Sequence, residues 1–404
     1  MAQGDQLYNV GGVLLSRPFK IRRLGHFGVN VTDVEAGLRF YRDLIGFKVS
    51  DVIDFGARAP EQVKGLGDPK GYFTRYGTDH HAFVLFNRRV MEAFNGRRFG
   101  ADKTINQITW QCGSLGEIVR AFGFFKERGV EIRRVGRDMP GSNWHVYVYD
   151  PDGHVNELYY GIEQIGWDGV SKPLPLYERG FRDLPTLPQM SEEAEVEQAR
   201  SRSVDIFSGM RSVEQAPARY DVDGVLLPRP FKVTRIGPVK LFVDDVARSL
   251  PFYEEILGFV PTEEVTVRGH RCVYLRQGTE HHSVALIPKA LREALGFSAQ
   301  TSLMAFGLEL GSYQQLKDAV RWLREQGVRL LDVPAELSPG IDYHAHVVDP
   351  EGHAVELYYY MEQVGWDGRP RPAPERRRLR EPWPDTLEPF SDTYVDQTFQ
   401  GPLG

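Results

Sequence analysis

The chain contains little cysteine and no segment suited to a membrane. Its 404 residues include two cysteines, Cys112 and Cys272, which lie far apart within apolar segments. Two such thiols provide neither a disulfide framework nor a cysteine zinc site, so a reducing cytoplasm is the expected compartment. No apolar run approaches the roughly 18 residues that span a bilayer, and the N-terminus lacks the basic and apolar regions of a secretory signal. We therefore expect a protein that is neither exported by that route nor embedded in a membrane.

An excess of positive charge is also missing. Lys and Arg number 49 against 55 for Asp and Glu, which gives a formal net charge of −6. No basic block is long enough to follow a phosphate backbone, so nucleic acid is not an expected partner. The chain is 41% hydrophobic and 12% aromatic, which is enough to bury two or more cores, and its length favours more than one domain.

The sequence repeats itself at long range. GVLLSRPFKIRRLGHFGVNVTD, from Gly12, returns as GVLLPRPFKVTRIGPVKLFVDD, from Gly224. YDPDGHVNELYYGIEQIGWDG returns as VDPEGHAVELYYYMEQVGWDG, so that Glu157 matches Glu356. The offset falls from 212 to 199 residues between these segments, chiefly because the first copy carries an insertion between Asp51 and Gly71. Loops tolerate such insertions, and this one is a candidate lid.

Each copy contains two smaller units of one kind. IRRLGHFGVNV and INQITWQC alternate as strands do, and each is followed by an amphipathic helical pattern and then by short strand-like runs. The pattern predicts an α+β fold of four βαβββ modules that form two tandem domains. The expected boundaries are 12–169 for the first domain, 170–215 for a linker with a polar helix, 216–368 for the second domain, and 369–404 for a Pro- and Arg-rich tail lying on the surface or on a partner subunit.

Two residues of the first copy suggest a metal site. His26 lies in the middle of a strand, and Gly25 and Gly28 leave room beside it; Glu157 lies in the apolar run VNELYY. Taken alone, the histidine fits a core residue and the glutamate fits the polar side of a strand. Together, an imidazole and a carboxylate suit a divalent first-row metal, and we expect the two groups to converge on one ion from opposite edges of a curved sheet.

At this point the sequence resembles a known superfamily. The four modules, the strand ending in HHAFVLF and the segment DPDGHVNELYY resemble the vicinal oxygen chelate superfamily, especially its two-domain type I extradiol ring-cleavage dioxygenases. The resemblance covers roughly residues 12–170 and 224–368, and it implies cupped mixed sheets of glyoxalase/dioxygenase type. It also implies cleavage of a catechol-type ring with O₂ at a mononuclear non-haem metal, Fe(II) or alternatively Mn(II). A small aromatic diol is the implied substrate, and we expect a homo-oligomer.

The resemblance also assigns residues. It gives His26 and Glu157 as metal ligands, and Gln107 stands where the family has its second histidine. Either Gln107 completes the set, which we prefer, or His80 or His81 does. The family's acid/base histidine corresponds to His81, and its substrate-facing tyrosine corresponds to Tyr147; His145, two residues earlier on the same strand face, would replace a further histidine that is absent here.

The second copy serves as an internal comparison. Its counterparts of His26, Gln107 and Tyr147 are read as Pro238, Leu303 and His346, while Glu356 and His282 remain. Proline and leucine do not ligate metals, so the metal is expected in the N-terminal domain and the C-terminal domain is expected to be metal-free. The aromatic residues Phe27, Phe83, Trp110 and Trp144 are candidate walls for a substrate ring, and His154 and His353 are expected to stabilise turns.

Two other functions stay open at this stage. The superfamily also includes metal-dependent glyoxalase-like isomerases and epimerases, for which a glutamine ligand would be suitable. It further includes non-catalytic proteins of the bleomycin-resistance type, which bind an aromatic ligand without metal ligands. The presence of both His26 and Glu157 argues against the binding protein, and the duplicated two-domain chain favours the dioxygenase.

Overall fold

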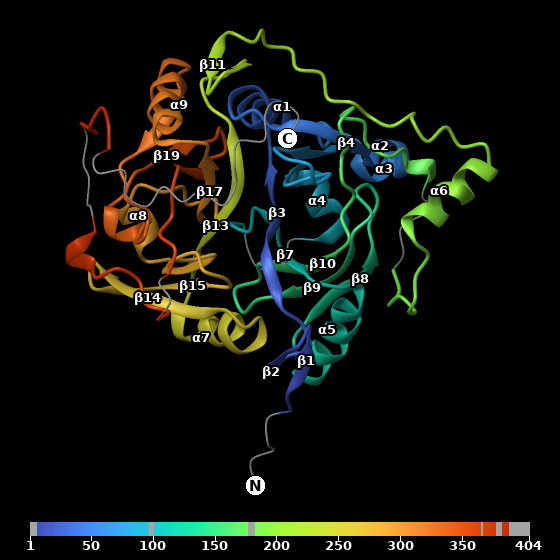
Figure 1. The fold of residues 1–404 in the computed structure, drawn as a ribbon, viewed down its shortest axis with the longest axis horizontal. Coiled ribbons are helices and arrows are strands. Elements are labelled where there is room, and N and C mark those ends of the chain that lie inside the picture. Colours follow the sequence, from blue (N-terminus) through green and yellow to red (C-terminus); the bar gives the residue numbers. More distant parts are fainter. Residues whose placement is uncertain (1–5, 97–100, 177–181, 365–366, 377–381, 388–404) are drawn as a thin grey trace. The chain divides into compact units, whose positions relative to one another are not determined.

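The chain folds into two compact units. The computed structural model describes residues 6–96, 101–176, 182–364, 367–376 and 382–387 (Figure 1). Unit 1 consists of Met1–Val34, Phe47–Val213 and Pro251–Gly258; unit 2 consists of Glu35–Gly46, Glu214–Leu250 and Phe259–Gly404. Within the described ranges, every helix is too short or too polar to cross a bilayer.

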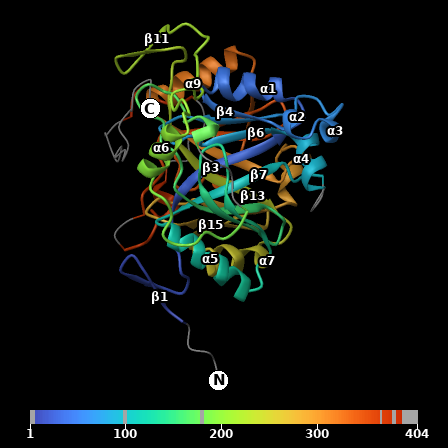
Figure 2. The same ribbon diagram turned by 90° about the vertical axis from the view of Figure 1, so that its right-hand side faces the viewer.

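Unit 1 is built on a mixed sheet of eight strands. In spatial order these are β4 (Lys48–Asp54), β5 (Lys70–Arg75), β6 (Phe83–Asn87), β3 (Ile21–Val31), β7 (Ile105–Cys112), β10 (Val155–Tyr160), β9 (Trp144–Tyr149) and β8 (Ile132–Arg137). The central strand β3 runs parallel to β6 and antiparallel to β7, and β10 runs parallel to β7. Strands from both modules of the first copy therefore meet at β3 and β7 (Figure 2).

Unit 2 repeats this order strand for strand. Its sheet runs β14 (Val260–Val267), β15 (His270–Arg276), β16 (Val284–Pro288), β13 (Val233–Val243), β17 (Leu303–Leu310), β20 (Ala354–Tyr358), β19 (His344–Val348) and β18 (Arg329–Leu331). The predicted α+β fold of tandem βαβββ modules is confirmed. Because the two sheets share one topology, the strand registers show which residue of unit 2 stands where each residue of unit 1 stands.

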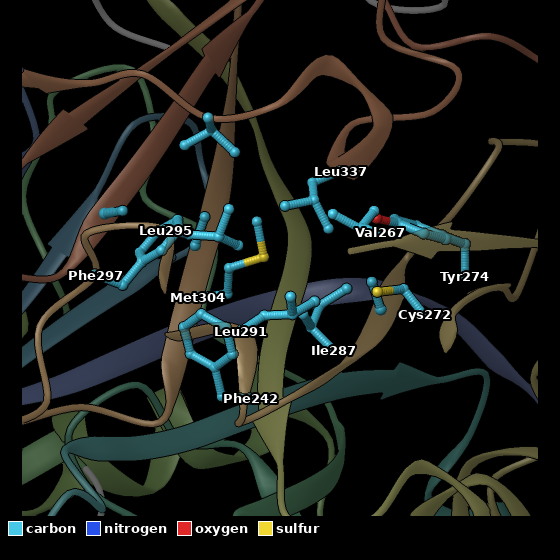
Figure 3. Close-up of a cluster of buried hydrophobic side chains, with 14 residues drawn as sticks. Phe242, Val267, Cys272, Tyr274, Ile287, Leu291, Leu295, Phe297, Met304 and Leu337 are labelled. Carbon is cyan, nitrogen blue, oxygen red and sulfur yellow. The ribbon is translucent and has the colours of Figure 1, made fainter. Parts of the chain in front are cut away.

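Local sequence explains the helices that flank these sheets. The helices α5 (Leu115–Glu127) and α9 (Tyr313–Glu325) begin after Ser114 and Ser312, whose hydroxyls accept hydrogen bonds from the backbone N–H three residues later. This is the usual N-terminal cap of a helix. Shorter helices are α1 (Val34–Leu38), α4 (Arg88–Asn95), α7 (Val246–Pro251) and α8 (Leu291–Ala294), and π-helical turns follow α1 and α7 at Arg39–Leu44 and Phe252–Ile256. A buried apolar cluster in unit 2 includes Phe242, Ile287, Met304 and Leu337 (Figure 3).

The insertion and the linker both carry helices. The insertion after β4 forms α2 (Phe55–Arg58) and α3 (Pro60–Val63), whereas in unit 2 β14 and β15 are joined directly by a tight turn at Arg268 and Gly269. The polar helix predicted in the linker is present as α6 (Glu192–Ser201). In the tail, residues 377–381 and 388–404 lie outside the described residues, while Trp383 packs beside Tyr313, whose hydroxyl donates to the carbonyl of Pro384 at 2.6 Å.

The Asp-Pro-x-Gly-His turns are held by a buried carboxylate. The Asp150 carboxylate accepts hydrogen bonds from the N–H of Asp152 at 3.0 Å and of His154 at 2.7 Å, and it pairs with Nδ1 of His154 at 2.8 Å. The hydroxyl of Tyr253 donates to the same carboxylate at 2.8 Å. Asp349 makes the same contacts with His353 and Tyr41 in unit 2. The prediction that His154 and His353 stabilise these turns is confirmed.

Replacing Asp150 with asparagine is expected to lower the free energy of unfolding by about 2 kcal/mol at pH 7, because a charged acceptor of several hydrogen bonds is lost. Burial raises the pKa of Asp150, but His154 and the hydrogen bonds outweigh this and lower it. The stabilisation is therefore present above the unfolded pKa of about 3.9 and is lost as the pH falls through the lowered folded pKa. Urea unfolding of both proteins from pH 7 to pH 3 checks this; equal midpoints at pH 7 would contradict it.

Candidate metal centre

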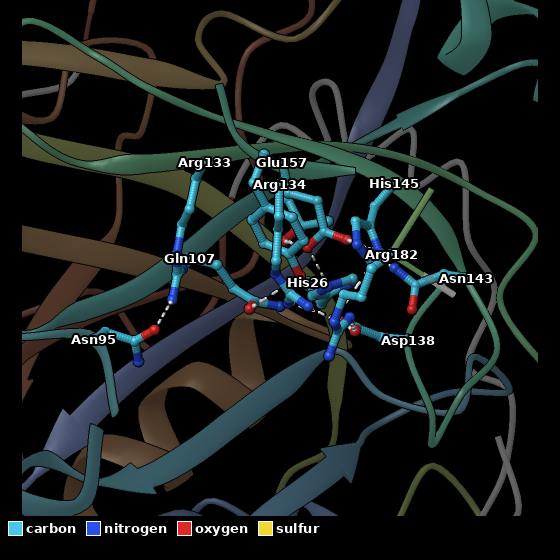
Figure 4. A network of polar contacts seen from close by, with 12 residues as sticks. His26, Asn95, Gln107, Arg133, Arg134, Asp138, Asn143, His145, Glu157 and Arg182 are labelled. Atoms are coloured by element: carbon cyan, nitrogen blue, oxygen red, sulfur yellow. Dashed lines mark hydrogen bonds and ion pairs between the residues drawn. The ribbon is translucent and has the colours of Figure 1, made fainter. Parts of the chain in front are cut away.

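Three adjacent strands bring His26, Gln107 and Glu157 to one place. In the sheet of unit 1, Thr109 of β7 lies opposite His26 of β3 on one side and beside Glu157 of β10 on the other. Gln107 lies two residues before Thr109 and opposite Gly28, so it shares a face of β7 with Thr109. The three residues that the family resemblance gives as ligands therefore lie close together on one face of the sheet (Figure 4).

The closest contact in this region joins His26 to Glu157. Nε2 of His26 lies 3.1 Å from Oε2 of Glu157, and both side chains are completely buried. Thr109 Oγ1 donates to the same oxygen at 2.8 Å, and Asn143 Nδ2 donates to Oε1 at 2.7 Å. Burial raises the pKa of Glu157, but His26 and the hydrogen bonds outweigh that effect and lower it, so the carboxylate is anionic.

Gln107 is tied to this pair through Tyr147. The Tyr147 hydroxyl donates to Oε1 of Gln107 at 3.4 Å, and Tyr147 lies directly opposite Glu157 in the β9–β10 pairing. The guanidinium of Arg134 stacks over the Tyr147 ring at 4.3 Å from its centroid and pairs with Asp138 at 2.6 Å. Burial raises the pKa of Tyr147 well above its ordinary value, so the phenol keeps its proton at neutral pH.

His145 lies beside the carboxylate on the same strand face as Tyr147. Its Nδ1 is 4.0 Å from Oε1 of Glu157 and 3.8 Å from Oδ2 of Asp138. Among the described residues, neither of its ring nitrogens has a hydrogen-bond partner. Burial lowers the pKa of His145 to about 4, so its imidazole is neutral at pH 7 and one nitrogen is available to accept a proton.

His81 lies on the other side of His26. The two ring centroids are 4.3 Å apart, and Nδ1 of His81 lies 3.0 Å from Nδ1 of His80. Burial lowers the pKa of His81 well below its ordinary value, so this imidazole too is neutral. Nε2 of His80 lies 3.5 Å from the carboxylate of Asp51, toward β4. His81 is therefore the histidine of this pair that neighbours the proposed ligands.

The donor set fits a divalent metal. Imidazole, carboxylate and amide oxygen all suit first-row divalent ions. The 3.1 Å between His26 Nε2 and Glu157 Oε2 is close to the distance between two ligand atoms that each lie about 2.1 Å from one ion at a right angle. The site can thus hold a cation between groups that otherwise contact each other directly.

The prediction that four aromatic residues form walls for a substrate ring is wrong. Phe27, Trp110 and Trp144 each follow or precede a site residue on the same strand, so they point to the opposite face of the sheet, where all are buried; Phe83 lies opposite Phe27. Trp110 Nε1 donates there to Asn156 at 2.9 Å. The aromatic ring beside the site is that of Phe73, whose centroid is 5.0 Å from that of His81.

The counterpart given for Gln107 in the second copy is also wrong. Glu356 of β20 lies opposite Gly307 of β17, as Glu157 lies opposite Thr109, so the position of Gln107 is held by Ala305 and not by Leu303. Alanine is no more a metal ligand than leucine. Pro238 does take the place of His26, because Val239 and Phe27, the residues that follow, donate to the matching carbonyls of Ser283 and Ala82.

Comparison with known proteins places this geometry in a family. The sequence pattern of the Glyoxalase/Bleomycin resistance protein/Dioxygenase superfamily matches residues 23–158 and 235–357, which together make up more than half of the chain. The chain belongs to this superfamily. Each matched segment runs from the central strand of one sheet, β3 or β13, to the strand that carries the glutamate, β10 or β20. The family resemblance inferred from the sequence is therefore confirmed.

The curated proteins to which this chain is similar include a dioxygenase and a metapyrocatechase. The chain is 23% identical to 3-methylcatechol 2,3-dioxygenase of Pseudomonas putida over 35% of this chain and 43% of that protein. It is 27% identical to metapyrocatechase 2 of Cupriavidus necator over 38% of this chain and 42% of that protein. The matched segments thus span about two fifths of these curated relatives.

Solved structures show the same fold over most of the chain. Homoprotocatechuate 2,3-dioxygenase from Arthrobacter globiformis has a TM-score of 0.53 at 18% identity, with 87% of this chain and 84% of that chain covered. The Mn(II)-bound glyoxalase from Novosphingobium aromaticivorans has a TM-score of 0.53 at 14% identity, with coverages of 86% and 85%. At these identities the likeness concerns the fold.

Proposed function

We propose that the protein is an extradiol dioxygenase that cleaves a catechol-type aromatic ring with O₂ at a mononuclear non-haem metal in unit 1. The observation that carries this proposal is the fully buried contact between His26 and Glu157, with Gln107 beside it. The partial similarity to 3-methylcatechol 2,3-dioxygenase supports the choice of a catechol-type substrate.

His26, Gln107 and Glu157 would hold Fe(II), or alternatively Mn(II). A divalent metal held by these residues would supply Lewis acidity that lowers the pKa of a diol hydroxyl. Two contacts support Gln107 over the neighbouring histidines as the third ligand. Nδ1 of His81 is engaged with His80, and His80 faces Asp51, whereas the amide oxygen of Gln107 is aimed toward Tyr147 beside Glu157.

Neutral histidines and a protonated tyrosine surround the ligands and suit proton transfer. His145 or His81 would accept a proton from a diol hydroxyl and return it later, since each imidazole is buried and uncharged at pH 7. Tyr147 would orient a substrate oxygen through its hydroxyl, which Arg134 holds in place by stacking on the ring. Phe73 would contact the substrate ring next to His81.

The test is anaerobic loading of the protein with Fe(II), followed by a series of catechols in the presence of O₂. Stoichiometric oxygen uptake with a coloured ring-opened product supports the dioxygenase. A protein that binds metal tightly but consumes no oxygen with any catechol would instead be assigned to metal-dependent isomerisation. A protein that binds catechols without metal would be a ligand-binding protein.

Replacing His81 with alanine is expected to leave the metal content unchanged and to lower kcat by about 10²-fold, the usual contribution of one acid/base group. Elemental analysis and oxygen uptake on the same preparation measure both quantities. The matched control is His270→Ala in β15 of unit 2, which should change neither quantity. Loss of the metal in His81→Ala would identify His81 as a ligand and remove Gln107 from that role.

A further inference from the structure

Unit 2 retains the glutamate of the site proposed in unit 1, but not the other two residues proposed there as ligands. Glu356 stands where Glu157 stands and is completely buried. Pro238 and Ala305 replace His26 and Gln107, and neither side chain offers a donor atom. A buried carboxylate without a partner is costly, so something else must balance its charge.

The balancing charge comes from Lys240. This residue stands where Gly28 stands in unit 1, because Gly28 lies between Val84 and Gln107 while Lys240 lies between Ala285 and Ala305. Nζ of Lys240 donates to Oε1 of Glu356 at 2.7 Å, to Oγ of Ser338 at 2.9 Å and to the carbonyl of Leu337 at 2.9 Å. Three acceptors match the three N–H groups of an ammonium.

A second set of metal-ligating side chains surrounds the same carboxylate. His344 and His346 lie two residues apart on β19, and His346 lies directly opposite Glu356 in the β19–β20 pairing. Nε2 of His346 is 3.4 Å from Oε1 of Glu356, and one ligand atom from each of the three residues lies within 4.8 Å of the others. Two imidazoles and one carboxylate make a set that binds Fe(II) and other first-row ions.

This set differs from the one in unit 1, since the strand registers equate His346 with Tyr147 and not with a proposed ligand. Within the described residues, Nε2 of His346 and Oε2 of Glu356 have no hydrogen-bond partner. Access from solvent exists: a cavity of about 960 Å³ in unit 2 is lined by His344 and His346 together with Leu331, Asp342 and Trp383. An ion could therefore reach the two imidazoles.

We propose that Lys240 is a resident cation that keeps unit 2 free of metal, and that His344, His346 and Glu356 form a latent site for a divalent first-row ion, which opens when this positive charge is removed. An ion bound to Glu356 would share the buried carboxylate with the ammonium of Lys240 at close range, where like charges repel strongly. The proposal rests on the proposed metal centre of unit 1 only for the comparison between Glu157 and Glu356.

The test uses Co(II) as the probe and a Glu157→Ala background, so that unit 1 contributes no metal. Metal per chain is measured after dialysis, and the visible absorption of Co(II) reports coordination by protein ligands. Glu157→Ala alone is expected to retain no Co(II). Glu157→Ala with Lys240→Ala is expected to retain one Co(II) per chain, and adding His346→Ala is expected to abolish that gain.

Lys240→Leu in the same background tests whether the lost charge or the vacated volume allows the metal to bind, because leucine removes the ammonium but fills more of its volume than alanine. The same variant replaces Lys240→Ala if the alanine variant does not fold. A folded Lys240 variant that retains no Co(II) would overturn the latent site. One Co(II) in Glu157→Ala with Lys240 intact would overturn the role of Lys240. A wild-type protein that binds no metal while the Lys240 variants do would refute the centre in unit 1 and leave this proposal standing.

Discussion

Replacement of Glu157 with alanine is expected to release the metal proposed for unit 1 and to lower the proposed ring-cleavage activity by at least about 10³-fold. Glu157 is the only anionic group in direct contact with His26 among the described residues, and its pKa is held below the ordinary value there. A catalytic metal contributes several kcal/mol to transition-state stabilisation, and each 1.36 kcal/mol is a factor of ten in rate. Losing the metal therefore removes most of the activity.

Elemental analysis after Fe(II) loading, together with oxygen uptake, measures this effect. The matched control is Glu117→Gln, which alters another buried carboxylate of unit 1. Glu117 lies in the first turn of α5, outside the proposed metal centre, and its carboxylate accepts a hydrogen bond from the N–H of Lys20 at 2.9 Å. The side-chain amide oxygen of glutamine would accept the same hydrogen bond. Metal content and activity should be unchanged in the control. A Glu157→Ala protein that keeps its iron would exclude Glu157 from the site.

The sequence alone predicts the architecture because the chain contains its own comparison. The two copies share helix and strand periodicity and the Asp-Pro-x-Gly-His turn, so an element read in one copy is supported by the other. Alternation along β3, β7 and β10 then places His26, Gln107 and Glu157 on one face. The same rule, applied to Phe27 and Trp110, would have placed them on the opposite face.

Other features depend on loops and registers that the sequence pattern does not specify. Asn143 reaches Glu157 from the segment before β9, which has no periodicity to predict its direction. Loop lengths differ between the copies, so the alignment offset changes along the chain, and the sequence comparison places the counterpart of Gln107 two residues before Ala305. Lys240 takes the place of a glycine, Gly28, so a comparison limited to the proposed ligands does not predict a cation beside Glu356.

Removing one partner of the buried ion pair in unit 2 is expected to destabilise that unit strongly. Both side chains are completely buried, so Glu356→Leu leaves the ammonium of Lys240 without a counter-charge, and Lys240→Leu leaves the carboxylate of Glu356 in the same condition. Each single variant should lower the free energy of unfolding by about 3–5 kcal/mol. Neither change touches unit 1, so the metal content of Glu356→Leu should equal that of the wild type.

The double variant Lys240→Leu with Glu356→Leu should regain most of this loss, because a buried ion pair replaced by apolar groups of similar size is often neutral or stabilising. Denaturant unfolding of the four proteins forms a double-mutant cycle.

Burial raises the pKa of Glu356, but Lys240 and the nearby histidines outweigh it and lower the pKa to about 2. The stability advantage of the wild type over the two single variants should thus be complete above the unfolded pKa of about 4.3 and disappear as the pH falls toward 2. Additive losses in the double variant would mean that the two charges do not depend on each other, and Lys240 would then be no substitute for a metal.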